Sequence, residues 1–169
     1  MKTSRTQIRG RGEAGESLAI GTILVPVDFS ECSQHGLDYA KSLAERFGAK
    51  LILLHSVPLQ YYLACDECAR YNLPLLMTQA EKAAKEQLQD LAKKTGRNGI
   101  EVKGSLQIGH AGEQVCARAV ELGADIIVTS THGRTGFKHV LLGSTAEYIV
   151  RHATCPVVVV PSHKPATTR

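Results

Sequence analysis

The stretch TILVPVDFSECSQHGLDYAKSLAERFGAKLILLHSV, from Thr22 to Val57, decides the fold class. It opens with a short apolar, β-branched run, Thr22–Val27, and closes with a second apolar run, Lys50–Val57. Between the two runs, Ser30–Phe47 carries apolar residues at helical spacing until Gly48 ends the pattern. The stretch therefore predicts a strand, a helix and a second strand.

The rest of the chain continues this alternation. Beyond an irregular segment, Pro58–Pro74, further helices are expected at Thr78–Lys94 with Gly96 as its C-terminal cap, at Gly112–Leu122 and at Gly143–His152. Further strands are expected at Ile100–Gln107, Asp125–Thr129 and Val157–Val160. Strands alternating with helices in this way predict an open parallel α/β sheet with helices on both faces. Ligands bind such sheets beyond the carboxyl ends of the strands, where the winding direction reverses.

Length and composition bound the class of protein. The chain has 169 residues, 43% of them hydrophobic and 21% charged, and a formal net charge of +4. These values are typical of one soluble globular domain. We expect a flexible tail over residues 1–20, the domain over 21–162 and a second flexible tail over 163–169. Part of the positive charge lies in the tails, so nucleic acid is not an expected partner.

The sequence also bears on the cellular compartment. No stretch approaches the roughly 18–20 apolar residues that cross a bilayer, and the first residues lack the apolar core of a signal peptide. Five cysteines cannot all pair within one chain, so they are interpreted as mostly free thiols of a reducing compartment. We therefore expect a cytoplasmic protein without a membrane partner.

Two common phosphate-binding signatures are missing. DFSE, residues 28–31, follows the first strand where a dinucleotide site would have G-x-G-x-x-G. Gly104 and Gly109 have the glycine spacing of a P-loop, but His110 and Ala111 follow in place of lysine and a hydroxyl residue. Neither type of site is expected.

A loop rich in glycine and hydroxyl residues follows the fourth strand. STHGRTG, residues 130–136, leads to GST, residues 143–145, at the start of a helix. Glycines let backbone amides approach an anion, and the N–H groups of a helix N-terminus attract negative charge. Two interpretations fit these residues: a phosphate site, or a turn at the glycines with Ser144 or Thr145 capping the helix.

Motifs along the whole predicted domain occur together with this loop. They are ILVPVDFSECS from Ile23, LLHSV from Leu53, GHAGEQV from Gly109, GADIIV from Gly123 and CPVVVVP from Cys155. In this order, and over Gly21–Pro161, they resemble the universal stress protein family in its ATP-binding branch. That branch carries G-x2-G-x9-G-[ST] after the fourth strand. The second glycine falls on Gly133 and Gly143-Ser144 completes the pattern, whereas Ser130 stands at the first glycine.

The resemblance implies a Rossmann-like sheet of order 3-2-1-4-5, similar to the adenine nucleotide alpha hydrolase-like fold, and ATP at its switch point. Adenine would lie near Ser56, Pro26 and Val27, ribose near Asp28 and Gly133, and phosphates over the glycine loop. The candidate nucleotide-binding residues are Pro26, Val27, Asp28, Ser56, Ser130, His132, Gly133, Arg134, Gly136, Gly143, Ser144 and Thr145. If position 130 needs a positive φ, serine there costs about 1 kcal/mol or more and binding weakens.

Several residues admit a plainer interpretation. Asp28 is either a ligand residue or a cap for the next helix. His132 is interpreted as a turn residue, because no carboxylate or nucleophile partner is visible, and His55 as a packed core histidine. No catalytic group is assigned. Slow ATP hydrolysis would need Mg²⁺ held by a carboxylate, for which Asp28 is the candidate.

The cysteines give a further alternative. Cys65 and Cys68 form a lone C-x-x-C pair, which suits a zinc site only if a second copy supplies the other ligands, and suits a redox switch otherwise. Incidental cysteines are the simpler interpretation. Cys32, Cys116 and Cys155 are expected to be small buried hydrophobic residues.

The last strand completes the functional hypothesis. A long apolar edge strand invites pairing with another copy, and the resemblance implies dimerisation through Val157, Val158, Val159 and Val160. The sequence therefore predicts a homodimeric, ATP-binding stress-response or signalling module with an unidentified protein partner. The alternatives are a protein-interaction scaffold of the same fold that has lost nucleotide binding, and a thiol or zinc sensor.

Overall fold

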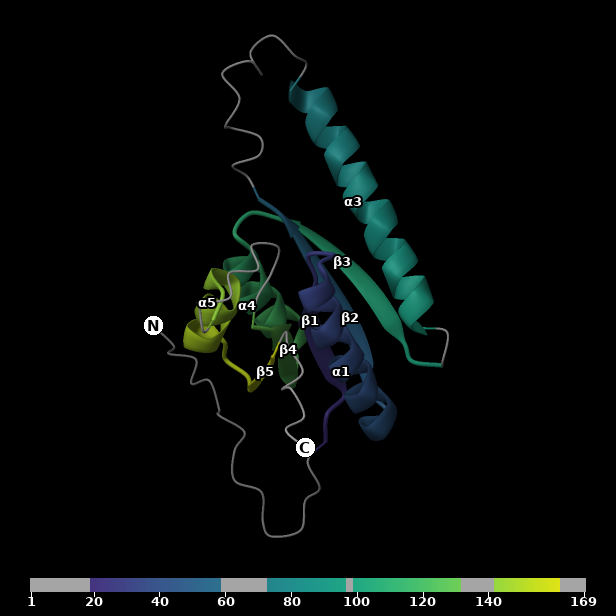
Figure 1. Cartoon of the computed structure of the whole chain (residues 1–169), viewed down its shortest axis with the longest axis vertical. Helices are drawn as coiled ribbons and strands as arrows, with labels where there is room; N and C mark the ends of the chain where they lie inside the picture. The colour runs from purple at the N-terminus through teal and green to yellow at the C-terminus, as the bar shows by residue number, and fades with distance from the viewer. Residues whose placement is uncertain (1–18, 59–72, 97–98, 132–141, 162–169) are drawn as a thin grey trace, which may run out of the picture.

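A five-stranded parallel sheet runs through the centre of the molecule in the order β3-β2-β1-β4-β5 (Figure 1). The computed structural model describes residues 19–58, 73–96, 99–131 and 142–161. The strands are β1 (Thr22–Pro26), β2 (Lys50–Val57), β3 (Val102–Ile108), β4 (Ile126–Ser130) and β5 (Val157–Val160). The helices are α1 (Glu31–Phe47), α3 (Leu73–Thr95), α4 (Ala111–Leu122) and α5 (Ser144–His152). The predicted fold class and strand order are confirmed.

The central strand β1 places the switch point. Its residues pair in parallel with β2 on one side, Pro26 opposite Leu54, and with β4 on the other, Ile23 opposite Ile126. The chain winds from β1 to β2 and β3 in one direction, and β4 and β5 continue in the other. Because all the pairings are parallel, the carboxyl ends of β1 and β4 lie side by side where the winding reverses.

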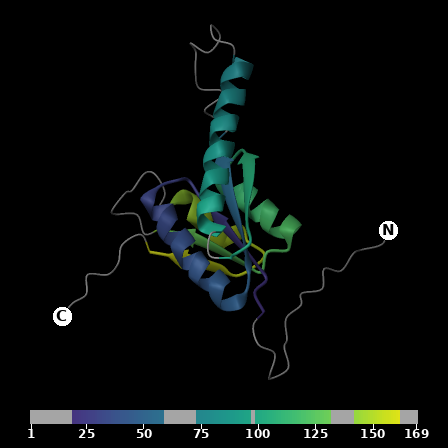
Figure 2. The same cartoon turned by 90° about the vertical axis from the view of Figure 1, so that its right-hand side faces the viewer.

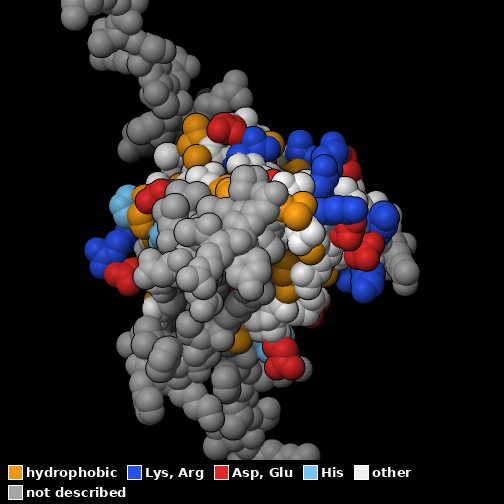
Figure 3. Space-filling view, turned by 90° about the horizontal axis from the view of Figure 1, so that it is seen from above, with side chains coloured by type: hydrophobic (Ala, Val, Ile, Leu, Met, Phe, Trp, Pro, Cys, Tyr) orange, Lys and Arg blue, Asp and Glu red, His pale blue; other side chains and the backbone are white. Residues whose placement is uncertain are grey.

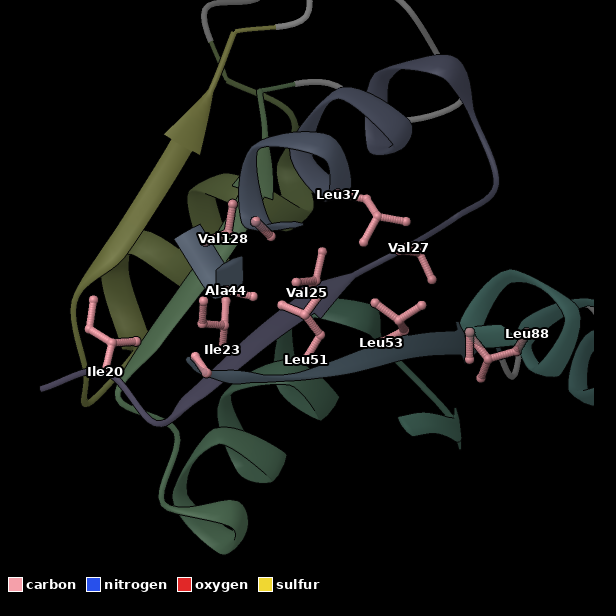
Figure 4. Packing of buried hydrophobic residues seen from close by; sticks show 13 residues of the cluster. Ile20, Ile23, Val25, Val27, Leu37, Ala44, Leu51, Leu53, Leu88 and Val128 are labelled. Carbon is pink, nitrogen blue, oxygen red and sulfur yellow. The ribbon is translucent and has the colours of Figure 1, made fainter. Parts of the chain in front are cut away.

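Each face of the sheet is buried by two helices. On one face, Leu37 of α1 and Leu88 of α3 pack with Ile23, Val25 and Leu53 of the strands (Figure 4). On the other face, α4 and α5 contribute to a second buried cluster, which contains Leu24, Ile52, Leu54, Val115, Ala119, Ala124, Ile127 and Ile149. Alternate residues of β1 and β2 thus enter opposite cores, which is why these strands are apolar at successive positions.

Local signals define both ends of α1 and the end of α4, and Gly48 ends α1 as predicted. Ser30 caps α1, and its Oγ accepts a hydrogen bond from the Ser33 N–H at 3.1 Å. Gly48 ends α1 with φ 66, and Gly123 ends α4 with φ 58. Both glycines occupy the left-handed region, where a side chain is disfavoured.

The helix expected at Thr78–Lys94 differs in both ends. It begins at Leu73, inside the segment predicted to be irregular. Proline is tolerated at position 74, because a backbone N–H in the first turn of a helix has no intrahelical acceptor and its absence costs no hydrogen bond. Gly96 is not a left-handed cap. Instead Gly99 adopts φ 83 and donates its N–H to the Gly96 carbonyl at 3.2 Å. The amino-terminal half of α3 projects beyond the sheet (Figures 1 and 2).

The described surface carries charges of both signs close together. Exposed ion pairs join Lys93 to Asp90 and Lys103 to Glu101. Basic and acidic side chains lie interspersed on the right of the view in Figure 3. Within the described ranges, no helix has the length and apolar character that a membrane crossing requires.

Asp125 ties the amino-terminal ends of β1 and β4 together. Its Oδ2 accepts the backbone N–H groups of Gly21 and Thr22, each at 2.9 Å. We expect Asp125→Ala to lower the free energy of unfolding by about 1 to 2 kcal/mol, because the buried Thr22 N–H loses its acceptor. Urea unfolding checks this value, with Asp90→Ala on the surface of α3 as the control. Equal stability of the two variants would contradict the expectation.

Candidate functional site

A pocket of about 320 Å³ opens at the carboxyl ends of β1, β2 and β4. The structure brings these predicted residues together in its lining: Pro26, Val27, Asp28, Ser56, Ser130, Gly143, Ser144 and Thr145. They come from three strand ends and the start of α5, far apart in the sequence. The other predicted residues, His132, Gly133, Arg134 and Gly136, lie outside the described residues, as do Cys65 and Cys68.

The sequence interpretation missed part of the lining. The additional residues are Ser33, Leu54, His55, Pro58, Ala111, Val115, Thr129, Thr131 and Ala146. Ala111 and Val115 belong to the GHAGEQV motif, whose position before a helix could have placed it at the same edge of the sheet. His55 is packed, as predicted, but it is only half-buried and lies at the pocket.

Asp28 does not cap α1 directly. Its Oδ1 accepts hydrogen bonds from the Ser30 backbone N–H at 3.0 Å and from the Ser30 Oγ at 2.5 Å. Ser30 in turn caps the helix. The carboxylate therefore orients the capping serine and also lines the pocket.

Ser130 occupies its position without backbone strain. In the described part of the chain, Phe29 is the only residue other than glycine with a positive φ, so Ser130 has a φ that any side chain tolerates. Gly36 of α1 approaches this point closely, because a Cβ there would lie 3.3 Å from the Ser130 backbone nitrogen. The conformational cost considered for serine at position 130 does not arise.

The N-terminus of α5 faces the pocket without a side-chain cap. Gly143 is the N-cap, with φ −69 and ψ 154, and as a glycine it offers the first turn no side-chain cap hydrogen bond. Ser144 and Thr145 are the first residues of the helix, so the interpretation that one of them caps it is wrong. The Gly143 N–H itself donates to the Thr131 carbonyl at 2.7 Å. The N–H groups and the positive end of the helix dipole lie where they favour an anion.

A second helix N-terminus is held at the pocket by β2. The Ser56 Oγ donates to the Gly109 carbonyl at 2.8 Å, and the Gly109 N–H donates to the Val57 carbonyl at 2.9 Å. Gly109 has φ 128, which favours glycine. His110, the N-cap of α4, makes no side-chain cap hydrogen bond. The first turn of α4 therefore also has no cap from the side chain of its N-cap residue.

The described lining divides into an apolar and a polar part. Val27, Leu54, Val115 and Ala146 are buried and apolar, whereas hydroxyl side chains and the N-termini of α4 and α5 supply the polar groups. Such a pocket suits a small molecule with a flat apolar group and an anionic group. In the described lining, Asp28 is the only carboxylate.

None of the described cysteines lines this pocket. Cys32, Cys116 and Cys155 are free thiols and half-buried, rather than fully buried as predicted. Cys116 and Cys155 pack against the core cluster beneath α4 and α5. Burial raises the pKa of both thiols above its ordinary value, which keeps them protonated and weakly nucleophilic at neutral pH. Among the described residues, no three His, Cys, Asp or Glu side chains are grouped as metal ligands.

An open parallel sheet with a pocket at its switch point, bordered by helix N-termini, defines a doubly wound α/β protein with a ligand-binding edge. The model of the Universal stress protein family matches residues 19–161. The chain belongs to the universal stress protein family.

Relatives of known sequence and structure agree with this assignment. Universal stress protein G of Escherichia coli O157:H7 is 31% identical over 141 residues, which are 82% of this chain and 97% of that protein. The solved structure of protein MJ0577, a universal stress protein of Methanocaldococcus jannaschii, has a TM-score of 0.77 and 28% identity. The superposition covers 88% of this chain and 100% of that one.

Two more distant structures share the fold and contain nucleotides. One is a universal stress protein in complex with cAMP, at 20% identity and a TM-score of 0.65, over 86% of this chain and 100% of that one. The other is the universal stress protein from Archaeoglobus fulgidus in complex with dAMP, at 22% identity and a TM-score of 0.59, over 85% and 99%.

Proposed function

We propose that this chain is an ATP-binding universal stress protein that acts as a nucleotide-dependent stress-response or signalling module in the cytoplasm. The observation that carries the proposal is the convergence of two helix N-termini without side-chain caps, those of α4 and α5, on the pocket at the switch point. Two proteins of this fold were solved in complex with cAMP and with dAMP, which supports an adenine nucleotide as the ligand class.

The residues of the pocket fit the parts of the nucleotide. Its volume of about 320 Å³ lies within the roughly 300–1,000 Å³ of small-molecule sites. The adenine ring would contact Val27 and the end of β2 around Ser56, and the ribose would lie near Asp28. The phosphates would accept hydrogen bonds from the first N–H groups of α5, at Ser144 and Thr145. If Mg²⁺ accompanies ATP, Asp28 is the described pocket carboxylate that would hold it.

The direct test uses the purified full-length protein. Nucleotide released by denaturation is identified by ion-exchange chromatography, and the stripped protein is titrated with Mg-ATP in a calorimeter. Bound adenine nucleotide or micromolar affinity supports the proposal. A protein that carries none and does not respond to millimolar ATP would disprove it and would favour a protein-interaction scaffold.

Ser130→Gly tests whether serine at this motif position impairs the site. Because Ser130 has no positive φ, glycine removes no strain there, and we expect ATP affinity to stay within about 3-fold of the unmodified protein. Glycine instead weakens the end of β4 by about 0.5 to 1 kcal/mol, since it has more backbone freedom in the unfolded chain. Calorimetric titration and urea unfolding measure the two effects. A gain of 10-fold or more in affinity would mean that Ser130 has damaged the site.

The proposed homodimer uses the exposed edge of the sheet. β5 is an edge strand and pairs on one side with β4, with Val157 opposite Ile127 and Val160 opposite Ser130. All four of its valines are half-buried. A second copy of β5, antiparallel across a two-fold axis, would complete the ladder. Sedimentation velocity tests the proposed dimer at protein concentrations of about 5 to 100 µM, which are on the order of those at which such interfaces form. A monomer throughout contradicts the proposed interface.

A further inference from the structure

Phe29 has an unusual backbone conformation at the edge of the pocket. It lies between Asp28, which lines the pocket, and Ser30, which caps α1, and its φ is 63. A side chain in this left-handed region costs about 1 to 2 kcal/mol. Neighbouring contacts must therefore stabilise the turn.

One set of contacts comes from within the turn itself. Asp28 accepts both hydrogen bonds from Ser30, and the Ser30 Oγ accepts the Ser33 N–H. These contacts fix the residues on either side of Phe29 to the start of α1. They do not connect the turn to the neighbouring strand β2.

The backbone makes one such connection, since the Val27 N–H donates to the Leu54 carbonyl of β2 at 2.8 Å. The side chain of His55 in β2 adds two more. Its Nδ1 lies 2.7 Å from the Val27 carbonyl oxygen, and its ring packs on Phe29 with centroids 4.5 Å apart at 43°. A carbonyl oxygen only accepts, so the Nδ1 carries the proton and donates. The two contacts lie on either side of Asp28, and they hold the turn against β2.

The position of this turn determines one wall of the pocket, because Val27, Asp28 and His55 all line it. We propose that His55 is a positioning residue for nucleotide binding, and that its hydrogen bond to Val27 and its packing on Phe29 hold Asp28 in the binding orientation. This inference rests on the proposed function, since it specifies how the same site is preorganised. Preorganisation contributes affinity by lowering the ordering cost of binding.

The test compares two replacements of His55 in the full-length protein by calorimetric titration with Mg-ATP. His55→Phe keeps a ring on Phe29 but has no donor, and should weaken ATP binding about 10-fold through loss of the Val27 hydrogen bond and displacement of Asp28. His55→Asn keeps an N–H donor near the place of Nδ1 and should lose about 3-fold or less. Asp125→Ala, which loses stability at the opposite end of the sheet, should bind ATP like the unmodified protein.

Crystal structures of the nucleotide-free variants separate this inference from the proposed function. We expect Phe29 to leave the left-handed region in His55→Phe and to keep it in His55→Asn. This result supports the inference even if no form of the protein binds ATP, in which case the proposed function alone fails. If Phe29 and Asp28 keep their positions in His55→Phe, the inference is overturned, whether ATP affinity is unchanged or falls through loss of a direct contact. If His55→Phe does not fold, the structure of His55→Ala takes its place. Phe29 and Asp28 in unchanged positions in that variant would also overturn the inference.

Discussion

Gly143→Gln is expected to weaken ATP binding at least 100-fold while leaving the fold intact. Gly143 lines the pocket and is the N-cap of α5. Its φ of −69 and ψ of 154 are extended values that glutamine adopts without strain. The new side chain would extend from the N-terminus of α5, where the phosphates are proposed to bind, and its bulk would exclude them. A 100-fold loss corresponds to about 2.7 kcal/mol of binding free energy.

Calorimetric titration with Mg-ATP measures this loss, and circular dichroism during urea unfolding checks the fold. Gly143→Ala is the matched control, because a methyl group at the same position leaves most of the volume open and should cost only a few-fold. If the ATP affinity of Gly143→Gln stays within about 3-fold of that of the unmodified protein, the phosphates bind elsewhere. A large loss of stability in the glutamine variant would instead make the change in binding uninformative about the pocket, and the expectation of an intact fold would be wrong.

Gly112→Ala is expected to lower the free energy of unfolding by about 2 kcal/mol and to weaken ATP binding. A Cβ on Gly112 would lie 2.7 to 2.8 Å from Cδ1, Cβ and Cγ of Tyr148. Alanine is favoured over glycine within a helix by up to about 1 kcal/mol, but overpacking of this kind costs about 1 to 3 kcal/mol. The clash prevails because the Tyr148 Cβ is close to the backbone, so α4 and α5 must separate.

The effect on binding follows from the location of Tyr148. It lies in α5, one turn beyond Ser144 and Thr145, so a shift of that helix moves the first turn at the pocket. Urea unfolding and calorimetry measure the two effects. Gly21→Ala is the control, because its Cβ would make only an ordinary contact, 3.6 Å from the Asp125 Oδ2, and should change stability by less than about 0.5 kcal/mol. Equal stabilities of Gly112→Ala and Gly21→Ala would show that α4 and α5 have room for a methyl group.

Part of the candidate site could be predicted because it follows directly after recognisable strands. Asp28 and Ser130 stand at the ends of β1 and β4, and parallel strands bring such positions to one edge. Gly143–Thr145 precedes an apolar helical pattern, which made it a candidate for an anion site. The order of the strands followed from the resemblance to a known family, since each strand alone is compatible with several neighbours.

The role of His55 could not be predicted in the same way. In the sequence it is one polar residue within an apolar strand, which is typical of a packed core histidine. Its contacts with Val27 and Phe29 join residues 26 to 28 positions apart in the chain. They exist only because β1 and β2 are neighbours in the sheet.

The sequence by itself determined the type and order of the helices and strands, and the helix ends at Gly48 and Gly123. These features depend on apolar periodicity and on the backbone preferences of single residues, which act over a few positions. The tertiary structure decided the form of the pocket, the positive φ of Phe29 and the close approach of Gly112 to Tyr148. These features depend on packing between elements distant in the chain, because side chains from separate helices and strands must fill one shared interior without overlap.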